Sequence, residues 1–155
     1  MVAQRTVGIP QAVTAFSDLL AQQPGRSVGE IQADAAQKLG AMLRSAGIPV
    51  REPDGRIPLQ GRHLILGVAS FSTVDLQLLD ELAQALDGSR ADAQRVAVFD
   101  LQQCRDQHDV ARYLPGAFGP VWNTPVLGIW DNGSLARRID GVAGCRQMLQ
   151  QEGLL

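Results

Sequence analysis

Hydrophobic residues follow two periodicities along the chain, and the change between them falls near residue 63. Before that point apolar side chains recur every three or four positions, which is the spacing of one face of a helix. From Leu64 to Ala69 they form a continuous run of strand length, which predicts a strand that is buried on both faces. The first part of the chain therefore predicts helices, and the rest predicts a sheet covered by other elements.

Two helices are predicted in the first 48 residues. The first covers residues 9–23 and ends at a Pro-Gly pair. The second begins at a capping box, S-x-x-E, in which the Ser27 and Glu30 side chains each bond a backbone N–H at the helix start. Its C-terminal cap is predicted at Gly47. The apolar face of this helix consists of Ile31, Ala35, Leu39, Met42 and Leu43.

Strands and helices alternate after a connector, rich in proline and glycine, that covers residues 48–62 and has room for one short edge strand. An Asn132-Gly133 pair predicts a tight hairpin, because both central positions of a type I′ turn need positive φ. The order β-α-β-α-β-β-α predicts an α/β layered sheet, with the first two strands parallel and the last two antiparallel. The predicted strands are 64–69, 95–99, 126–130 and 135–139, and the predicted helices are 72–87, 105–112 and 144–151.

Residues 62–152 resemble the thioredoxin fold in this order and in several local sequences. In that family a Thr-Pro pair opens the third core strand, and here Thr124-Pro125 stands in that place. The resemblance implies a three-layer thioredoxin-like domain over residues 62–155, a cis peptide bond at Pro125, and a helical extension with its connector over residues 1–61. It rests on Val98-Phe99-Asp100-Leu101, Ala111-Arg112-Tyr113, the stretch from Asn123 to Gly133, and Arg138-Ile139-Asp140-Gly141.

The chain departs from thioredoxins where they carry their redox chemistry. Their Cys-x-x-Cys motif lies where the first core strand enters its helix, and here residues 69–74 read ASFSTV. Disulfide exchange needs one thiolate to attack and a second thiol to resolve the intermediate. The first strand also lacks the buried carboxylate that the family uses for proton transfer. We expect a redox-inactive relative that has no dithiol oxidoreductase activity.

The two cysteines, Cys104 and Cys145, are possible reactive thiols. In the expected strand order they are separated by three strand spacings, roughly 14 Å, whereas a disulfide needs Cα atoms within about 7 Å. A helix N-terminus lowers a thiol pKa, which makes Cys145 a candidate. The alternative function is therefore a single-cysteine thiol-disulfide or glutathione-linked redox protein, although an inert thiol is the expectation at both positions.

By the same resemblance, a groove for an extended polypeptide lies beside the cis-proline. This mode of binding is strand addition, in which main-chain hydrogen bonds supply affinity. We expect a non-catalytic module that binds another protein or peptide, as an adaptor, assembly factor or chaperone-like protein. A structural subunit of a larger complex is a further possibility. The groove residues are Ser70, Phe71, Ser72, Thr73, Trp122, Asn123, Thr124, Pro125, Gly141 and Val142.

Composition and charge narrow the classes of function and partner that remain. The chain has 155 residues, 45% of them apolar, and a net charge of −2, which gives no reason to expect nucleic acid or a membrane surface as partner. No phosphate-binding glycine motif or metal-ligand spacing occurs, so neither cofactor nor metal is expected. A bacterial, cytoplasmic protein is the default expectation, and the oligomeric state and the role of the N-terminal helices stay open.

Overall fold

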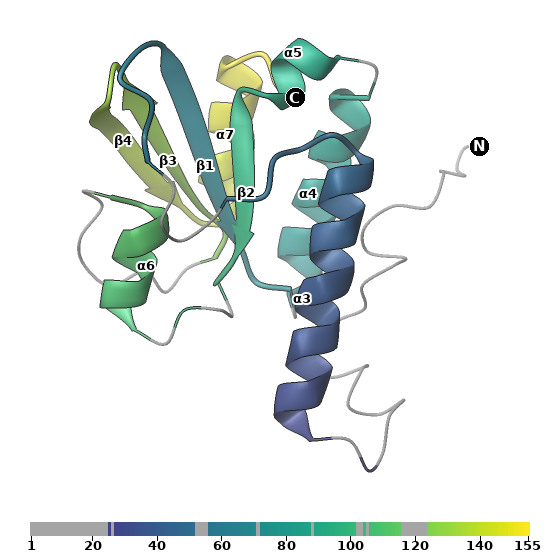
Figure 1. The fold of residues 1–155 in the computed structure, drawn as a ribbon. Coiled ribbons are helices and arrows are strands. Elements are labelled where there is room, and N and C mark those ends of the chain that lie inside the picture. The colour runs from purple at the N-terminus through teal and green to yellow at the C-terminus, as the bar shows by residue number, and fades with distance from the viewer. Residues whose placement is uncertain are drawn as a thin grey trace.

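The computed structural model describes residues 25, 27–51, 56–70, 72–87, 89–101, 104, 106–115 and 124–155. These residues form an α/β fold with a mixed four-stranded sheet, in the order β2-β1-β3-β4 (Figure 1). Strands β1 and β2 are parallel, and β3 is antiparallel to both β1 and β4. The strands are β1 (Arg62–Val68), β2 (Val96–Asp100), β3 (Val126–Asp131) and β4 (Ser134–Asp140).

Five helices accompany the sheet in the described residues. They are α3 (Val28–Ser45), α4 (Thr73–Ala85), α5 (Arg90–Ala93), α6 (Gln107–Tyr113) and α7 (Val142–Gln151). The order from β1 onward agrees with the predicted alternation, apart from the short α5. Helix α7 begins at Val142, two residues before its predicted start. The predicted helix over residues 9–23 lies outside the described residues.

Each face of the sheet carries its own hydrophobic core, which explains the continuous apolar run of β1. Leu64, Leu66 and Val68 point to one face, where they pack with α3, α4 and α7. Ile65 points to the other face, where it packs with Phe99 and the α6 residues Val110 and Tyr113. Figure 1 shows α6 on the side of the sheet opposite α3 and α4. The result is three layers, with the sheet in the middle.

Local sequence signals fix the ends of α3. The predicted capping box is confirmed: the Ser27 hydroxyl accepts from the Glu30 N–H at 3.1 Å, and the Glu30 carboxylate accepts from the Ser27 N–H at 2.9 Å. At the other end the N–H of Gly47 bonds the Arg44 carbonyl, and the N–H of Ile48 bonds the Leu43 carbonyl. This pair of bonds is a Schellman motif, which satisfies carbonyls left without a partner at a helix end.

The connector after α3 contributes one parallel bridge to the edge of the sheet. The N–H of Val98 bonds the Pro49 carbonyl at 3.0 Å, and the N–H of Arg51 bonds the Val98 carbonyl at 2.8 Å. This bridge, centred on Val50, confirms the short edge segment expected there.

The hairpin between β3 and β4 has the predicted geometry. Asn132 has φ 50° and Gly133 has φ 85°, both positive as a type I′ turn requires. Ser134 pairs with Asp131 directly across this two-residue loop. Within the described residues, no helix is both long and apolar enough to cross a membrane.

Candidate functional site

Three of the predicted groove segments meet at one edge of the sheet. Pairing of β1 with β3 reaches Gly67 opposite Val126, and pairing of β3 with β4 reaches Val126 opposite Asp140. The segments that follow or precede these positions therefore emerge side by side. They are residues 69–73 after β1, 124–125 before β3, and 141–142 after β4. Phe71, Trp122 and Asn123 lie outside the described residues.

The carbonyl oxygen of Pro125 joins two of these segments. It accepts from the N–H of Gly141 at 2.8 Å and from the thiol of Cys145 at 3.5 Å. The Thr124–Pro125 peptide bond is cis. Gly141 caps the start of α7 with φ 90°, a conformation that favours glycine. The start of α7 is thereby fixed against the backbone that precedes β3.

Two buried carboxylates hold the turn between β1 and α4. Asp75, in the first turn of α4, accepts from the Ala69 N–H at 2.9 Å and is 1% exposed. Asp100, at the end of β2, accepts from the Ser70 N–H at 3.3 Å and is 4% exposed. Backbone donors at a buried turn need such partners. The backbone of residues 69 and 70 is thus held by carboxylate acceptors from two neighbouring elements, α4 and β2.

Sequence reasoning missed both carboxylates because it looked for one within β1, which indeed contains none. The available signal for Asp75 was its place three residues after Ser72. The hydroxyl of Ser72 caps α4 by accepting from the Asp75 N–H at 3.3 Å. A carboxylate at this position of a helix can turn back toward the preceding strand end, as Asp75 does.

The surface at this edge is small, and the exposed carboxylate of Asp140 at the end of β4 brings a charge to its described part. The side chain of Ser70 is fully buried, and Pro125 is buried as well, so neither presents a side chain to a partner. Thr73 is exposed, and Val74 beside it is 49% exposed, one of the large apolar residues that the fold leaves open. Thr124 and Val142 are partly exposed. A partner would therefore meet threonine and valine side chains here.

Both cysteines are free thiols, and burial keeps both protonated at neutral pH. Desolvation raises the pKa of Cys145 to about 12, and the carboxylates of Asp140 and Asp75 act in the same direction. Desolvation raises the pKa of Cys104 to about 11, with Asp109 the next cause. For Cys145 this direction is opposite to the lowering expected from its place near a helix N-terminus. Burial outweighs the helix dipole because the side chain is 0% exposed.

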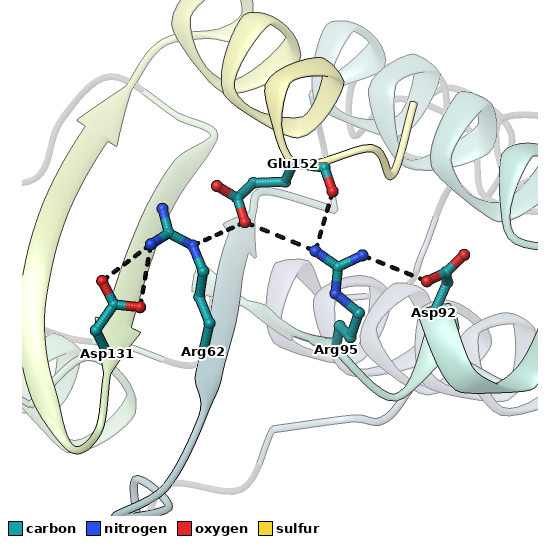
Figure 2. Close-up of polar contacts among 5 residues, drawn as sticks. All are labelled: Arg62, Asp92, Arg95, Asp131 and Glu152. Carbon is teal, nitrogen blue, oxygen red and sulfur yellow. Dashed lines mark hydrogen bonds and ion pairs between the residues drawn. The ribbon is translucent and has the colours of Figure 1, made fainter.

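The opposite edge of the sheet carries a chain of ion pairs. Figure 2 shows Glu152 between two arginines, with Arg62 Nε 2.8 Å and Arg95 Nη2 3.7 Å from its Oε1. Arg62 also contacts Asp131 at 2.9 Å, and Arg95 contacts Asp92 at 3.3 Å. These contacts join β1, β3, α5, the residue before β2 and the end of α7. We call this ion-pair network the clasp, and it lies at the opposite edge of the sheet from the predicted groove. Its residues are Arg62, Asp92, Arg95, Asp131 and Glu152.

Within the described residues, no group of three or more His, Cys, Asp or Glu side chains lies close enough together to hold a metal ion. His63 binds the Gln60 carbonyl through Nε2 at 2.9 Å, so its ring serves the local turn. Comparison of the sequence with models of known families gives no match, and a search of curated proteins gives none.

Proposed function

We propose that this protein is a thioredoxin-like binding module that holds an extended segment of another protein without thiol chemistry. The observation that carries the proposal is the meeting of the 69–73, 124–125 and 141–142 segments at one sheet edge. Strand order β2-β1-β3-β4, with β1 parallel to β2 and antiparallel to β3, agrees with the resemblance to thioredoxins. We therefore propose the role of an adaptor, assembly factor or chaperone-like protein.

The chemistry of the edge supports binding in preference to catalysis. Residues 69–74 contain no cysteine. The thiol of Cys145, which contacts the backbone of this edge, is fully buried and donates to the Pro125 carbonyl. A thiol with a pKa of about 12 is almost entirely protonated at neutral pH and is a poor nucleophile. The same residue instead fixes the backbone that the proposed groove uses.

The proposed partner is an extended, uncharged peptide segment. Backbone groups at a strand end pair with an added strand, and the side chains beside it select its sequence. Thr73, Val74, Thr124 and Val142 offer methyl groups and hydroxyls at this edge, with no charge among them. Apolar or small partner side chains fit such a surface, whereas an acidic one would be repelled by the exposed carboxylate of Asp140 at the end of β4.

The experiment is selection of binding peptides from a random library on the full chain, in the presence of dithiothreitol. Selected peptides are expected to lose at least about tenfold in affinity for Thr124→Arg, because a bulky cation then blocks the edge. Ala41→Arg is the matched control, since residue 41 is exposed on α3 away from this edge. Selected peptides that bind Thr124→Arg and the control equally well would reject the groove. Peptides that are selected only when dithiothreitol is left out would instead favour the single-cysteine alternative.

A further inference from the structure

Strand β4 is an edge strand whose outer side is open. The sheet order β2-β1-β3-β4 places it outermost, next to β3 (Figure 1). The other edge strand, β2, receives the connector through the bridge between Val50 and Val98. Among the described residues, no segment pairs with β4 on the side away from β3. The open side of an edge strand is a template for pairing with another strand.

The register with β3 shows which backbone groups of β4 point outward. The N–H of Gly141 bonds the Pro125 carbonyl, and hydrogen-bonded and non-hydrogen-bonded pairs alternate along an antiparallel ladder. Asp140, the next residue, therefore belongs to a non-hydrogen-bonded pair, and so does Arg138 two residues earlier. The N–H and C=O groups of Arg138 and Asp140 thus point away from β3, whereas those of Ile139 are used within the sheet.

A bulge limits the open side to the second half of β4. Ala136 has no residue opposite it on β3, because its neighbours Leu135 and Arg137 pair with consecutive β3 residues. A bulge bends a strand and interrupts its ladder. At the other end, Gly141 has φ 90° and leaves the extended conformation. Regular pairing with a further strand is therefore confined to residues 137–140.

The charges on this segment match a second copy of the same strand. Arg138 and Asp140 are two residues apart, so their side chains lie on one face of the sheet. In an antiparallel pair with Ile139 opposite its own copy, each Arg138 lies directly opposite Asp140 of the other copy. Opposite charges at such positions stabilise a strand pair. The outward backbone groups of the same two residues bond each other in this register.

Like charges disfavour the neighbouring registers. Because outward backbone groups must meet, the second copy slides along β4 only in steps of two residues. One step places Arg138 opposite Arg138 of the second copy, and the step in the other direction places Asp140 opposite Asp140. Like charges directly opposite each other destabilise a strand pair. The sequence of β4 therefore selects one register for pairing with itself.

Both side chains are suited to this contact between copies. Asp140 is exposed, so its carboxylate is accessible to a second chain. Arg138 is partly buried and already interacts within its own chain. A guanidinium has five N–H donors, so it can bind a further carboxylate beside the contact that it already makes.

We propose that β4 pairs with β4 of a second copy of this chain, antiparallel and with Ile139 at the two-fold axis, so that one sheet continues across the dimer. Such an isologous contact uses the same surface on both copies. The paired segment is short, and the dimer is expected to be weak, with a dissociation constant of about 100 µM. The inference does not depend on the proposed groove, whose test uses Thr124.

The first test is sedimentation equilibrium of the full chain, at concentrations up to about tenfold above that constant. The average mass is expected to rise from that of the monomer toward that of the dimer. A monomer mass at every concentration would overturn the proposal and leave the outer side of β4 to a different occupant.

Two charge reversals test the register. Asp140→Lys and Arg138→Glu each place like charges opposite one another, and each is expected to weaken self-association at least about tenfold. An equimolar mixture of the two variants should dimerise again, because each introduced charge then lies opposite a charge of the other sign. A mixture that stays monomeric would contradict this register.

Arg137→Glu is the matched control for these variants. Residue 137 is exposed and lies opposite the uncharged Gly141 in the proposed register, so self-association should not change. If Arg138→Glu fails to fold, Asp140→Lys still decides, because residue 140 is exposed. Self-association of Asp140→Lys as strong as that of the original chain would overturn the proposal.

Hydrogen exchange locates the contact on the chain. The amides of Arg138 and Asp140 should exchange more slowly at high protein concentration, because a second copy then accepts their hydrogen bonds. The Ile139 amide, which is already used within the sheet, is the internal control and should not change. A dimer that leaves the exchange of the Arg138 and Asp140 amides unchanged would form through another surface, contrary to the proposal.

Discussion

The thiol of Cys145 donates a hydrogen bond to the carbonyl oxygen of Pro125, 3.5 Å away. The same sulfur lies 3.7 Å from the Ile139 carbonyl oxygen, so one buried side chain contacts the backbone before β3 and near the end of β4. This contact assigns Cys145 a structural role. It also makes the geometry of the proposed groove depend on a residue that no partner would touch.

Replacing Cys145 by alanine is expected to destabilise the protein by about 1–2 kcal/mol. The change removes a buried sulfur and one weak hydrogen bond. Urea denaturation would show the loss as a lower midpoint with an unchanged slope. Cys104→Ala, at a partly buried position, should cost less. A variant at position 145 as stable as the original protein would show that the thiol contributes nothing to the fold.

Stability should fall as the pH rises above 9. Both thiols have raised folded-state pKa values, about 11 for Cys104 and about 12 for Cys145, against an ordinary value of 9.0. An unfolded chain therefore loses these protons first, so the stabilisation is complete below pH 9 and is lost between pH 9 and 12. Denaturation at a series of pH values measures this loss of stability. The slope should be shallower in Cys145→Ala, and an identical slope would refute this assignment.

The same pKa values predict slow alkylation at neutral pH. With a pKa of about 11, only about one Cys104 thiol in ten thousand is ionised at pH 7. Iodoacetamide labelling followed by mass spectrometry should modify Cys104 slowly and Cys145 only in denaturant. Fast labelling of either folded-state thiol at pH 6 would make the single-cysteine redox protein the favoured function in place of the binding module.

Glu152→Gln tests the clasp at the opposite sheet edge. This carboxylate is 11% exposed and lies between Arg62 and Arg95. Its loss should cost about 1 kcal/mol, more than an exposed pair contributes. The matched control is Glu81→Gln, which breaks the more exposed pair with Arg146. The cost at position 152 should shrink in high salt. Equal losses of stability in the two variants would show that the network around Glu152 contributes no more to stability than the exposed Glu81–Arg146 pair.

Gly128→Ala should be among the most destabilising small substitutions in the sheet. Trp130 lies along β3 over this glycine, and an added Cβ would come within 2.5 Å of its Cη2 and Cζ3 atoms. Overpacking of this kind costs roughly 1–3 kcal/mol. Because phenylalanine lacks the indole's second ring, Trp130→Phe should recover part of that cost in the double variant. Additive losses in calorimetry would show that the two positions do not interact.

The sequence predicted the elements well where a local signal fixes them. The Ser27 capping box and the Asn132-Gly133 turn need only neighbouring residues, and the structure has both. The apolar run of β1 likewise indicated burial on both faces, because no other arrangement hides consecutive large side chains. These features depend on backbone geometry and burial within a few residues.

Features that depend on contacts between distant elements were not predictable. Asp75 and Asp100 look like ordinary polar residues at element ends, yet both are buried as acceptors for one turn. For Cys145, proximity to a helix N-terminus indicated a lowered pKa, but burial that only the assembled fold supplies reverses it.

The position of α7 in the chain has a consequence for biosynthesis. All four strands precede α7, which supplies Cys145, Met148 and Leu149 to the larger core, while Glu152 beyond it joins the clasp on β1. A chain synthesised as far as residue 140 therefore has all four strands, while one apolar face still lacks α7 and Arg62 lacks Glu152. Such a nascent chain is a natural substrate for chaperones. Only after α7 has been synthesised can Glu152, at its C-terminal end, pair with Arg62 and so join β1 to α7.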